Sequence, residues 1–218
     1  MLSSQYSAPQ DQYAEPVVEL DRLGLEQDTA AIGLEQDAAA IDVEGARAAI
    51  ADLLIALGRD PSDPHLAETP RRVARAFEEM LTARPAAWTT FPNTDGYTDL
   101  LIVKDIPFHS LCQHHLLPFR GVAHIGYIPG DRLIGLSKLA RGLELFARDL
   151  QLQERLTVQV ADWLMGTLDA RGAGAVLEAE HLCMSLRGVE ASGALTTTSA
   201  FRGELNTPGP QQDRFFSK

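Results

Sequence analysis

The sequence has few cysteines, few lysines and no long apolar run. Two cysteines, Cys112 and Cys183, among 218 residues are too few for a disulfide-rich scaffold. With only three lysines (Lys104, Lys138 and Lys218) and a formal charge of −11, a protein that binds nucleic acid without regard to sequence is not expected. No stretch approaches the roughly 20 apolar residues of a membrane span, and the N-terminus lacks the features of a secretory signal. We therefore expect a cytoplasmic globular protein with no membrane and no nucleic-acid partner.

The negative charge is concentrated near the N-terminus. Residues 1–41 hold eight acids and one base, which leaves −4 for residues 42–218. This leader also contains a nine-residue duplication, GLEQDTAAI at 24–32 and GLEQDAAAI at 33–41. Two copies of so short a unit do not make a solenoid. We interpret 1–41 as a disordered acidic leader, followed by a helical region at 42–90 and a main domain at 91–218.

Hydrophobic periodicity predicts an α+β fold. Three- and four-residue spacing predicts helices at 43–57 and from Thr69, taken as the N-cap, to Pro85. Helices are also predicted at 136–150, with Ser137 available as a cap, and at 154–170. The expected strands lie at 100–108, 121–129, 175–187 and 194–203. Two strands, two helices and two strands after a leading helical pair indicate an α+β plan, and residues past Asn206 are expected to be loop.

The densest chemical cluster is CQHH at 112–115, and Cys183 follows His181 by two residues. Thiolate and imidazole groups are zinc ligands, so Cys112, His115 and Cys183 would leave a fourth position open for water, as in catalytic zinc sites. In the expected strand, alternate side chains share one face: His181, Cys183, Ser185 and Arg187. The alternative is that both cysteines are small buried apolar residues and the histidines are ordinary polar ones.

Cationic side chains form a second group of candidates. They are Arg72 and Arg75 on one helix face, Lys138 and Arg141 on another, and Arg187 on the strand of Cys183. Lys138 directly follows Ser137 at an expected helix start, where backbone N–H groups also favour anions. A substrate with several phosphates would suit such a group. The alternative is that each pair lies on a solvated helix face.

Gln153 and Glu154 open the helix predicted at 154–170. A carboxylate beside an amide suits the donor edge of a guanine base. A glutamate in the first turn of a helix is equally explained by the helix dipole, so this pair remains open by itself.

Five motifs, in this order, are similar to those of GTP cyclohydrolase I: CQHH at 112–115, GLSKLAR at 135–141, QLQERLT at 151–157, EHLCMSLRGV at 180–189 and TTTS at 196–199. The resemblance covers about 43–205 and implies the tunnelling fold (T-fold), an antiparallel sheet with two helices on one face, with 91–218 as its catalytic domain. It implies a zinc-dependent hydrolase that opens the imidazole ring of GTP at C8. Formate is released and 7,8-dihydroneopterin triphosphate is formed, for tetrahydrofolate or pterin biosynthesis. It also implies a homodecamer of two pentamers with active sites shared between subunits.

The resemblance assigns a role to each candidate residue. The zinc ligands are Cys112, His115 and Cys183, and the proton-transfer residues are His114 and His181. The substrate-binding residues are Arg72, Arg75, Ser137, Lys138, Arg141, Gln153, Glu154 and Arg187. Glu154, with Gln153 beside it, matches the guanine anchor, and Ser137 lies near the ribose and triphosphate. The cations match the triphosphate clamp, with Arg72 and Arg75 supplied by a neighbouring subunit.

Three positions depart from the usual pattern of the family. Gln113 replaces a glutamate in the metal motif, Arg75 stands where lysine is common, and Glu190 stands where a basic residue is frequent. We expect activity because every ligand and proton-transfer position is filled. The alternatives are a paralogue that binds GTP or a partner without full turnover, or a different zinc purine hydrolase. A nucleobase deaminase is disfavoured because the His-x-Glu…Pro-Cys-x-x-Cys signature is missing, and the nitrile reductase of deazaguanine metabolism because no matching motif is present.

Overall fold

The structure is a computed structural model that describes residues 40–84 and 86–217. The predicted acidic leader, with almost all of its duplication, lies outside the described residues. In the part of the chain that is described, no helix has the length and apolar character needed to cross a bilayer.

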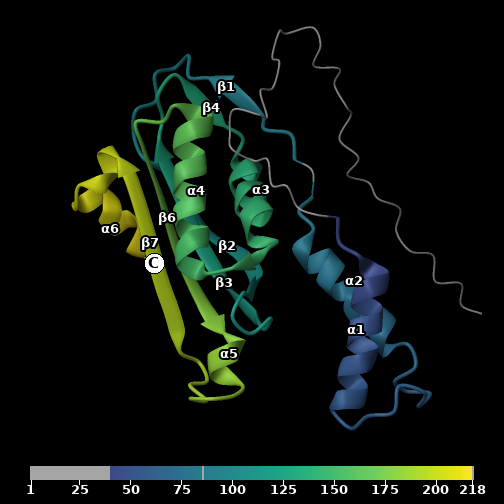
Figure 1. Cartoon of the computed structure of the whole chain (residues 1–218). Helices are drawn as coiled ribbons and strands as arrows, with labels where there is room; N and C mark the ends of the chain where they lie inside the picture. Colours follow the sequence, from purple (N-terminus) through teal and green to yellow (C-terminus); the bar gives the residue numbers. More distant parts are fainter. Residues whose placement is uncertain (1–39, 85, 218) are drawn as a thin grey trace, which may run out of the picture.

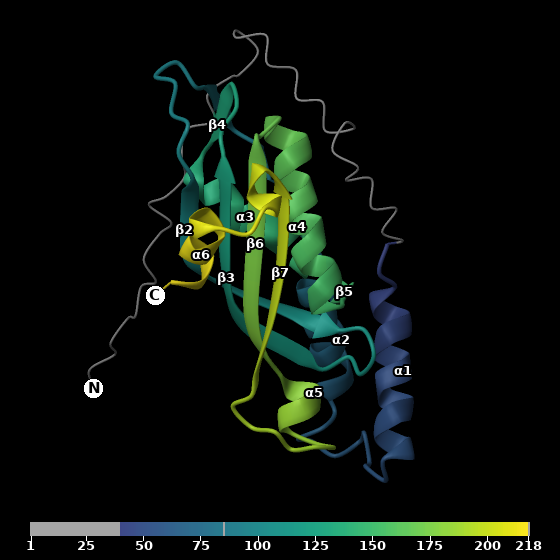
Figure 2. The same cartoon turned by 90° about the vertical axis from the view of Figure 1, so that its left-hand side faces the viewer.

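The centre of the fold is a five-stranded sheet in the order β5-β2-β3-β6-β7 (Figures 1 and 2). Its four long strands are β2 (Leu101–Cys112), β3 (Pro118–Ile128), β6 (Gly172–His181) and β7 (Leu195–Gly203), each antiparallel to its neighbour. The short β5 (Leu150–Gln151) runs parallel to the end of β2. Two further short strands, β1 (Thr90–Pro92) and β4 (Arg132–Ile134), pair with each other. The sequence patterns did not predict β1, β4 or β5.

Two helices cover one face of this sheet, α3 (Leu136–Ala147) and α4 (Gln153–Leu168) (Figure 1). Their apolar sides and the alternate residues of β6 that face them form the main core. Its members include Leu139, Leu143, Phe146, Leu156, Val160, Leu164, Ala175, Leu177 and Ala179. Burial of these side chains gives the main driving force for folding. The arrangement confirms the predicted α+β class and the T-fold plan of two helices on one face of an antiparallel sheet.

The opposite face of the sheet is covered by the C-terminal helix α6 (Pro210–Phe216), after the short η3 (Glu204–Asn206) (Figure 2). The prediction of loop past Asn206 is therefore wrong for residues 210–216. Pro210 begins the helix, where its missing N–H costs nothing. Phe215 is fully buried beside Val176 and packs edge-on against Phe201, with 5.1 Å between ring centroids. This contact fixes a segment whose own sequence shows no clear helical period.

The strand predicted at 175–187 is wrong after His181, where β6 ends. Residues Leu182–Ser185 form the single-turn helix α5 instead. The pairing with β3 ends at Phe119 opposite His181, and beyond Phe119 that strand has only Pro118, which has no N–H to donate. Cys183, Ser185 and Arg187 therefore do not share a strand face with His181.

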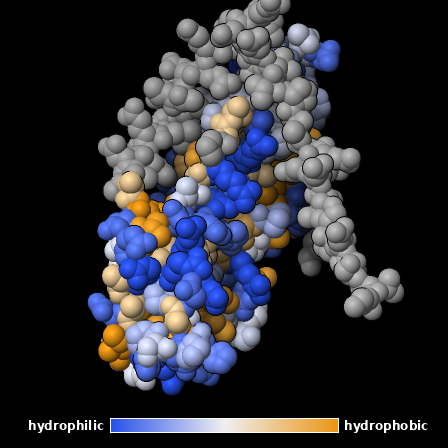
Figure 3. Space-filling model, turned by 90° about the vertical axis from the view of Figure 1, so that its right-hand side faces the viewer, coloured by the Kyte–Doolittle hydropathy of each residue, from blue (hydrophilic) through white to orange (hydrophobic). Residues whose placement is uncertain are grey.

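The N-terminal helices α1 (Val43–Ala56) and α2 (Thr69–Leu81) pack on each other beside the sheet (Figure 1). Asp42 caps α1 through a 2.8 Å bond from the N–H of Gly45 to its carboxylate. The face of the molecule that carries these helices is largely hydrophilic, with separate apolar patches (Figure 3). In the described residues, neither apolar cluster of the protein draws a member from α1 or α2.

Two predicted helix caps are displaced along the sequence. Glu68, and not Thr69, is the N-cap of α2, so that Thr69 is the first helical residue. Gly135 is the N-cap of α3, which places Ser137 inside the helix as its second residue. The hydroxyl of Ser137 is therefore not used as a cap, and the residue is exposed to solvent.

Candidate functional site

The turn from β2 to β3 brings three metal-ligand side chains together. Cys112, the last residue of β2, donates its N–H to the carbonyl of Leu117 (2.9 Å), and its own carbonyl accepts from His115 (3.2 Å) and Leu116 (2.9 Å). In this tight turn, the Sγ of Cys112 lies 3.7 Å from Nδ1 of His115 and 4.0 Å from Nδ1 of His114. Ligand atoms of Cys112, His114 and His115 all lie within 4.8 Å of one another. The turn is therefore a Cys/His group that can hold a metal ion.

Helix α5 adds the second cysteine to this group. The Sγ of Cys183 lies 4.0 Å from the Sγ of Cys112, and both residues are buried. Burial raises the pKa of the Cys183 thiol, and the neighbouring Cys112 raises it further, while the positive charge of Arg187 acts in the opposite direction. A metal ion reverses this balance because it binds the thiolate. Of the predicted ligands, His115 and Cys183 thus each lie within 4.0 Å of the Cys112 sulfur, whereas the group whose ligand atoms are all mutually close contains His114 and not Cys183. Arg187 lies near enough to act on the Cys183 thiol.

His181 is held at the end of β6, two residues before Cys183. Its ring stacks on Phe119, its partner in the sheet register, with 4.7 Å between centroids and 2° between planes. Its Nε2 lies 2.7 Å from Oε1 of Gln153. Desolvation by its surroundings lowers the pKa of His181, and the charge of Glu154 partly opposes this effect. The ring is therefore fixed both in its plane and at one nitrogen.

Gln153, predicted from the sequence as a substrate group, is bonded within the protein. The residue is 1% exposed, and the two hydrogens of its Nε2 are shared among three acceptors, the carbonyls of Leu177 (3.0 Å) and Thr196 (2.9 Å) and Oγ1 of Thr198 (3.1 Å). Its Oε1 is occupied by His181. The amide has no free edge for a base. Glu154 beside it is exposed in the first turn of α4 and remains the candidate guanine anchor.

The beginning of α3, with Ser137 and Lys138, lies far from the metal-binding turn. The N–H of Ile134, two residues before α3, donates to the hydroxyl of Tyr127 (3.0 Å), and Tyr127 pairs with Leu101 at the start of β2. Cys112 lies eleven residues further along β2, which is about 35 Å at the rise of a strand. Ser137 and Lys138, at the beginning of α3, therefore sit near the opposite end of the sheet.

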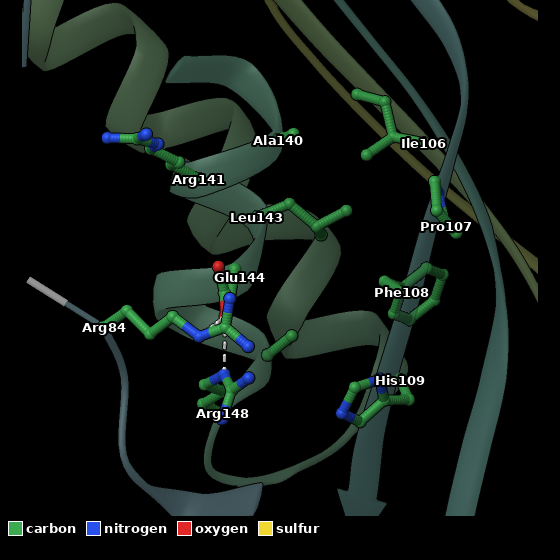
Figure 4. A pocket seen from close by; sticks show the side chains of 11 residues that line it. Arg84, Ile106, Pro107, Phe108, His109, Ala140, Arg141, Leu143, Glu144 and Arg148 are labelled. Carbon is green, nitrogen blue, oxygen red and sulfur yellow. Dashed lines mark hydrogen bonds and ion pairs between the residues drawn. The ribbon is translucent and has the colours of Figure 1, made fainter. Parts of the chain in front are cut away.

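Arg141 lines a pocket of about 290 Å³ between α3 and β2 (Figure 4). Its apolar wall includes Ile106, Phe108 and Leu143, and its rim carries Arg84, Arg141, Arg148 and Glu144. Oε1 of Glu144 pairs with Nε of both Arg148 (2.7 Å) and Arg84 (3.3 Å). One carboxylate is thus paired with two guanidinium groups, and Arg141 adds a third positive charge to the lining, which leaves the rim positive.

Of the remaining predicted cations, two lie on α2 and one lies beside Cys183. Arg72 and Arg75 are exposed on α2, beside the sheet. Arg187 is exposed just after α5, on the side of Cys183. Within one chain, the structure thus unites the cysteines and histidines but leaves the α2 and α3 cations elsewhere.

Two residues of the site, Phe119 and Thr198, were not among the predicted site residues. Phe119 stacks on His181, and Thr198 helps to hold Gln153. Thr198 lies in the TTTS motif at 196–199, which gave a signal without a role. Phe119 gave none, because its importance arises only from its register opposite His181.

The family model described as GTP cyclohydrolase I matches residues 46–218. The chain belongs to the GTP cyclohydrolase I family. Among its relatives, the GTP cyclohydrolase 1 of Mycolicibacterium gilvum is 52% identical over 167 residues, covering 74% of this chain and 83% of the relative. That of Corynebacterium glutamicum is 50% identical over 177 residues, covering 79% of this chain and 90% of the relative.

Membership of the GTP cyclohydrolase I family confirms the resemblance drawn from the five motifs. The match begins at residue 46, so the acidic leader lies outside it. Among solved structures, the archaeosine synthase QueF-Like in the apo form overlaps with a TM-score of 0.38 and 13% identity, over 48% of this chain and 93% of that chain. Likeness at this level supports no conclusion about fold or function.

Proposed function

We propose that this protein is a zinc-dependent GTP cyclohydrolase. It hydrolyses the imidazole ring of GTP at C8, so that both C8–N bonds are broken with two waters and C8 leaves as formate. The ribose then rearranges, and the freed amine closes a new ring on its carbons with loss of one water, which gives 7,8-dihydroneopterin triphosphate. The observation that carries the proposal is the meeting of Cys112, Cys183 and His115 beside a stacked, hydrogen-bonded His181, in a chain of the GTP cyclohydrolase I family. The product would serve tetrahydrofolate or pterin biosynthesis.

The two separations that involve the Cys112 sulfur fit zinc. Tetrahedral bonds of about 2.3 Å to sulfur and about 2.1 Å to nitrogen separate two sulfurs by about 3.8 Å, and a sulfur from a nitrogen by about 3.6 Å. The sulfurs of Cys112 and Cys183 are 4.0 Å apart, and Cys112 Sγ lies 3.7 Å from Nδ1 of His115. Three such ligands leave one position for water, and zinc held there lowers the pKa of that water to about 7, which supplies a nucleophile at neutral pH.

The surrounding residues bind the substrate and move protons. His114, exposed beside the ligands, and His181 are placed to exchange protons with the ring nitrogens and with water as the imidazole ring opens. The carboxylate of Glu154 accepts hydrogen bonds from the donor edge of the guanine base. Arg187 contributes positive charge on the side of Cys183.

The test of this function follows product and metal together. The purified protein is incubated with GTP while formate and the pterin absorbance are measured, with and without a chelator. We expect equal amounts of both products, loss of both after chelation and recovery on adding zinc. Full activity in metal-free protein would refute the role of zinc, and ammonia in place of formate would indicate a deaminase.

Two residues are candidates for the third ligand, because Nδ1 of His114 and Sγ of Cys183 both lie 4.0 Å from Sγ of Cys112. We expect Cys183→Ser to lose zinc and formate release, and His114→Ala to keep one zinc per chain while turnover falls by about 10²-fold or more. Met184→Leu, at an exposed position beside Cys183, is the matched control. If Cys183→Ser retains zinc and His114→Ala loses it, then His114 is the ligand and Cys183 is not.

We further propose that a complete site combines subunits, in a homodecamer of two pentamers. Because α3 begins near the far end of β2 from Cys112, Lys138 would reach a triphosphate at a metal-binding turn of another copy, and Arg141 one turn further along the helix would lie on the same side. Arg72 and Arg75 would come from a neighbouring subunit in the same way. An exposed cation on a helix face is otherwise of little energetic value.

Subunit mixing tests this sharing. Cys183→Ser and the double variant Lys138→Ala/Arg141→Ala are each expected to be inactive when pure. When the two are co-expressed, junctions with both wild-type halves form, and a fraction of the activity returns. Light scattering gives the mass of the assembly. If the mixed assembly stays inactive although mass spectrometry shows both chains in it, the site is not shared.

A further inference from the structure

The amide of Gln153 is held in one orientation by groups that can only accept hydrogen bonds. Its Nε2 faces the backbone carbonyls of Leu177, on β6, at 3.0 Å and Thr196, on β7, at 2.9 Å. A rotation of the amide by 180° would set its oxygen against both carbonyl oxygens, inside a site that is 1% exposed. The unpaired groups would then cost free energy without any compensating bond. Oε1 must therefore face His181.

The hydroxyls around Gln153 agree with this orientation. Thr157 Oγ1 lies 2.6 Å from the carbonyl of Gln153, which can only accept, so that the hydroxyl of Thr157 donates there. Thr198 Oγ1, 2.6 Å from Thr157 Oγ1, must then donate to Thr157. Its lone pairs remain free to accept from Nε2 of Gln153 at 3.1 Å. The hydroxyl hydrogens of Thr157 and Thr198 thus each have one consistent position, and the two hydrogens of the Gln153 amide are shared among three acceptors.

This chain of bonds fixes the proton on His181. An amide oxygen only accepts, so at 2.7 Å the Nε2 of His181 must carry hydrogen. A 180° flip of the ring would keep its plane stacked on Phe119, but it would put Cε1 in place of Nε2 and lose the hydrogen bond to Gln153. We infer that Gln153 is a positioning residue that keeps neutral His181 in the Nε2–H tautomer, so that Nδ1 is its only proton-accepting atom.

The consequence for the reaction rests on the proposed function, in which His181 exchanges protons with the substrate. A neutral histidine accepts a proton only at its bare nitrogen, and the bond at the other nitrogen decides which one is bare. With Nε2–H directed into the protein at Gln153, Nδ1 takes the proton and returns it. Proton transfer by a positioned side chain contributes about 10²–10⁴-fold in rate.

The first test does not depend on GTP. The zinc-loaded protein, with all histidine ring nitrogens labelled with ¹⁵N, is measured by solid-state NMR, which is suited to a large assembly. The signals of His181 are identified by their loss in His181→Asn. At a pH where the ring is neutral, we expect a protonated Nε2 and a bare Nδ1. A protonated Nδ1 with a bare Nε2 would overturn the inference even if GTP hydrolysis is confirmed.

The second test uses a variant of Gln153. Gln153→Leu removes the acceptor at His181 and is expected to give a mixture of the two tautomers. In Gln153→Leu, kcat should fall by about 10²-fold with little change in KM and one zinc per chain retained. An unchanged kcat or an unchanged tautomer in folded Gln153→Leu would overturn the inference.

A matched control separates positioning from general loss of stability. Gln151 is also 1% exposed, and its amide bonds to the carbonyl of Phe146 (2.8 Å) and to Oε1 of Gln159 (2.9 Å), with no bond to His181. Gln151→Leu thus removes a comparable buried amide. We expect it to keep the His181 tautomer. If Gln151→Leu changes the tautomer as much as Gln153→Leu does, the effect is not specific to Gln153 and the inference fails.

Discussion

The contact between Gly142 and Trp163 sets how closely α3 and α4 approach, and it can be tested by adding one methyl group. A Cβ on Gly142 would overlap Cζ3 and Cη2 of the Trp163 ring and lie 2.9 Å from Cε3. That ring is 3% exposed and is held by Trp88, at 5.0 Å between centroids, and by Phe146, at 6.5 Å. It cannot move aside without disturbing both.

The expected stability change combines two opposite effects. Overpacking at a site this tight costs about 3 kcal/mol, and alanine in place of a helical glycine returns about 1 kcal/mol. Gly142→Ala should therefore lower the free energy of unfolding by about 2 kcal/mol. Gly166→Ala, in α4 with no atom near its Cβ, is the control and should raise it by up to about 1 kcal/mol.

Denaturant unfolding followed by far-ultraviolet circular dichroism measures both variants. One protein concentration is used throughout, because the midpoint of an assembly depends on concentration. Tryptophan fluorescence of native Gly142→Ala should also change, whereas that of Gly166→Ala should not. If both variants move the midpoint in the same direction, the reasoning about α3 and α4 is refuted.

Three further predictions concern stability. Phe215→Ala should lower the free energy of unfolding by about 3–5 kcal/mol in thermal or denaturant unfolding, because this side chain of α6 is fully buried. Phe216→Ala is the control: its side chain is 52% exposed, and the change should be less than about 0.5 kcal/mol. Equal effects would contradict the described packing of α6. Arg171→Ala removes an exposed ion pair with Glu204 and should lower the free energy of unfolding by at most about 1 kcal/mol, and by less in high salt. A salt-independent loss above about 2 kcal/mol would show that the pair is not solvated. Chelation should lower the melting temperature and zinc should restore it, because the ligands bind metal only in the folded chain; an unchanged calorimetric transition would argue against a metal at Cys112.

The main helices and strands were predictable because their patterns are local. Leu139, Leu143 and Phe146 recur at helical spacing and are all buried against the sheet. The strand over 194–203 matches β7 within one residue. In each case the residues that carry the pattern are those that the fold buries.

The end of β6 could not be read from the sequence, because it depends on a partner. Nothing between His181 and Arg187 interrupts the chain locally, but the register with β3 ends at Phe119. Cys112, His115 and Cys183 were nevertheless chosen as candidate ligands by their chemistry, and the structure places His115 and Cys183 each within 4.0 Å of the Cys112 sulfur. Their meeting did not require the strand face that the alternation suggested.

The environment of Gln153 could not be predicted either, because it also depends on residues distant in the sequence. Its neighbour Glu154 suggested a shared role at the base, but the groups that its amide contacts lie 24 and 43 residues away, at Leu177 and Thr196. A sequence pattern shows which side chain is present. Which groups surround it depends on the pairing of β6 with β7 and on the position of α4 above them.

The attachment of α2 to the rest of the molecule has a consequence for how ionic strength acts on it. Arg148 donates to the carbonyls of Glu79 and, at 3.3 Å, Thr82 near the end of α2, and Arg84 pairs with Glu144. The Arg84–Glu144 pair, in which the Arg84 side chain is 74% exposed, weakens as salt shortens the Debye length to about 8 Å at 0.15 M, whereas the largely buried Arg148 is screened less. The burial that joins α3 and α4 to the sheet has no such sensitivity. Added salt therefore acts on the placement of α2 and its arginines while the turn at Cys112 stays as it is.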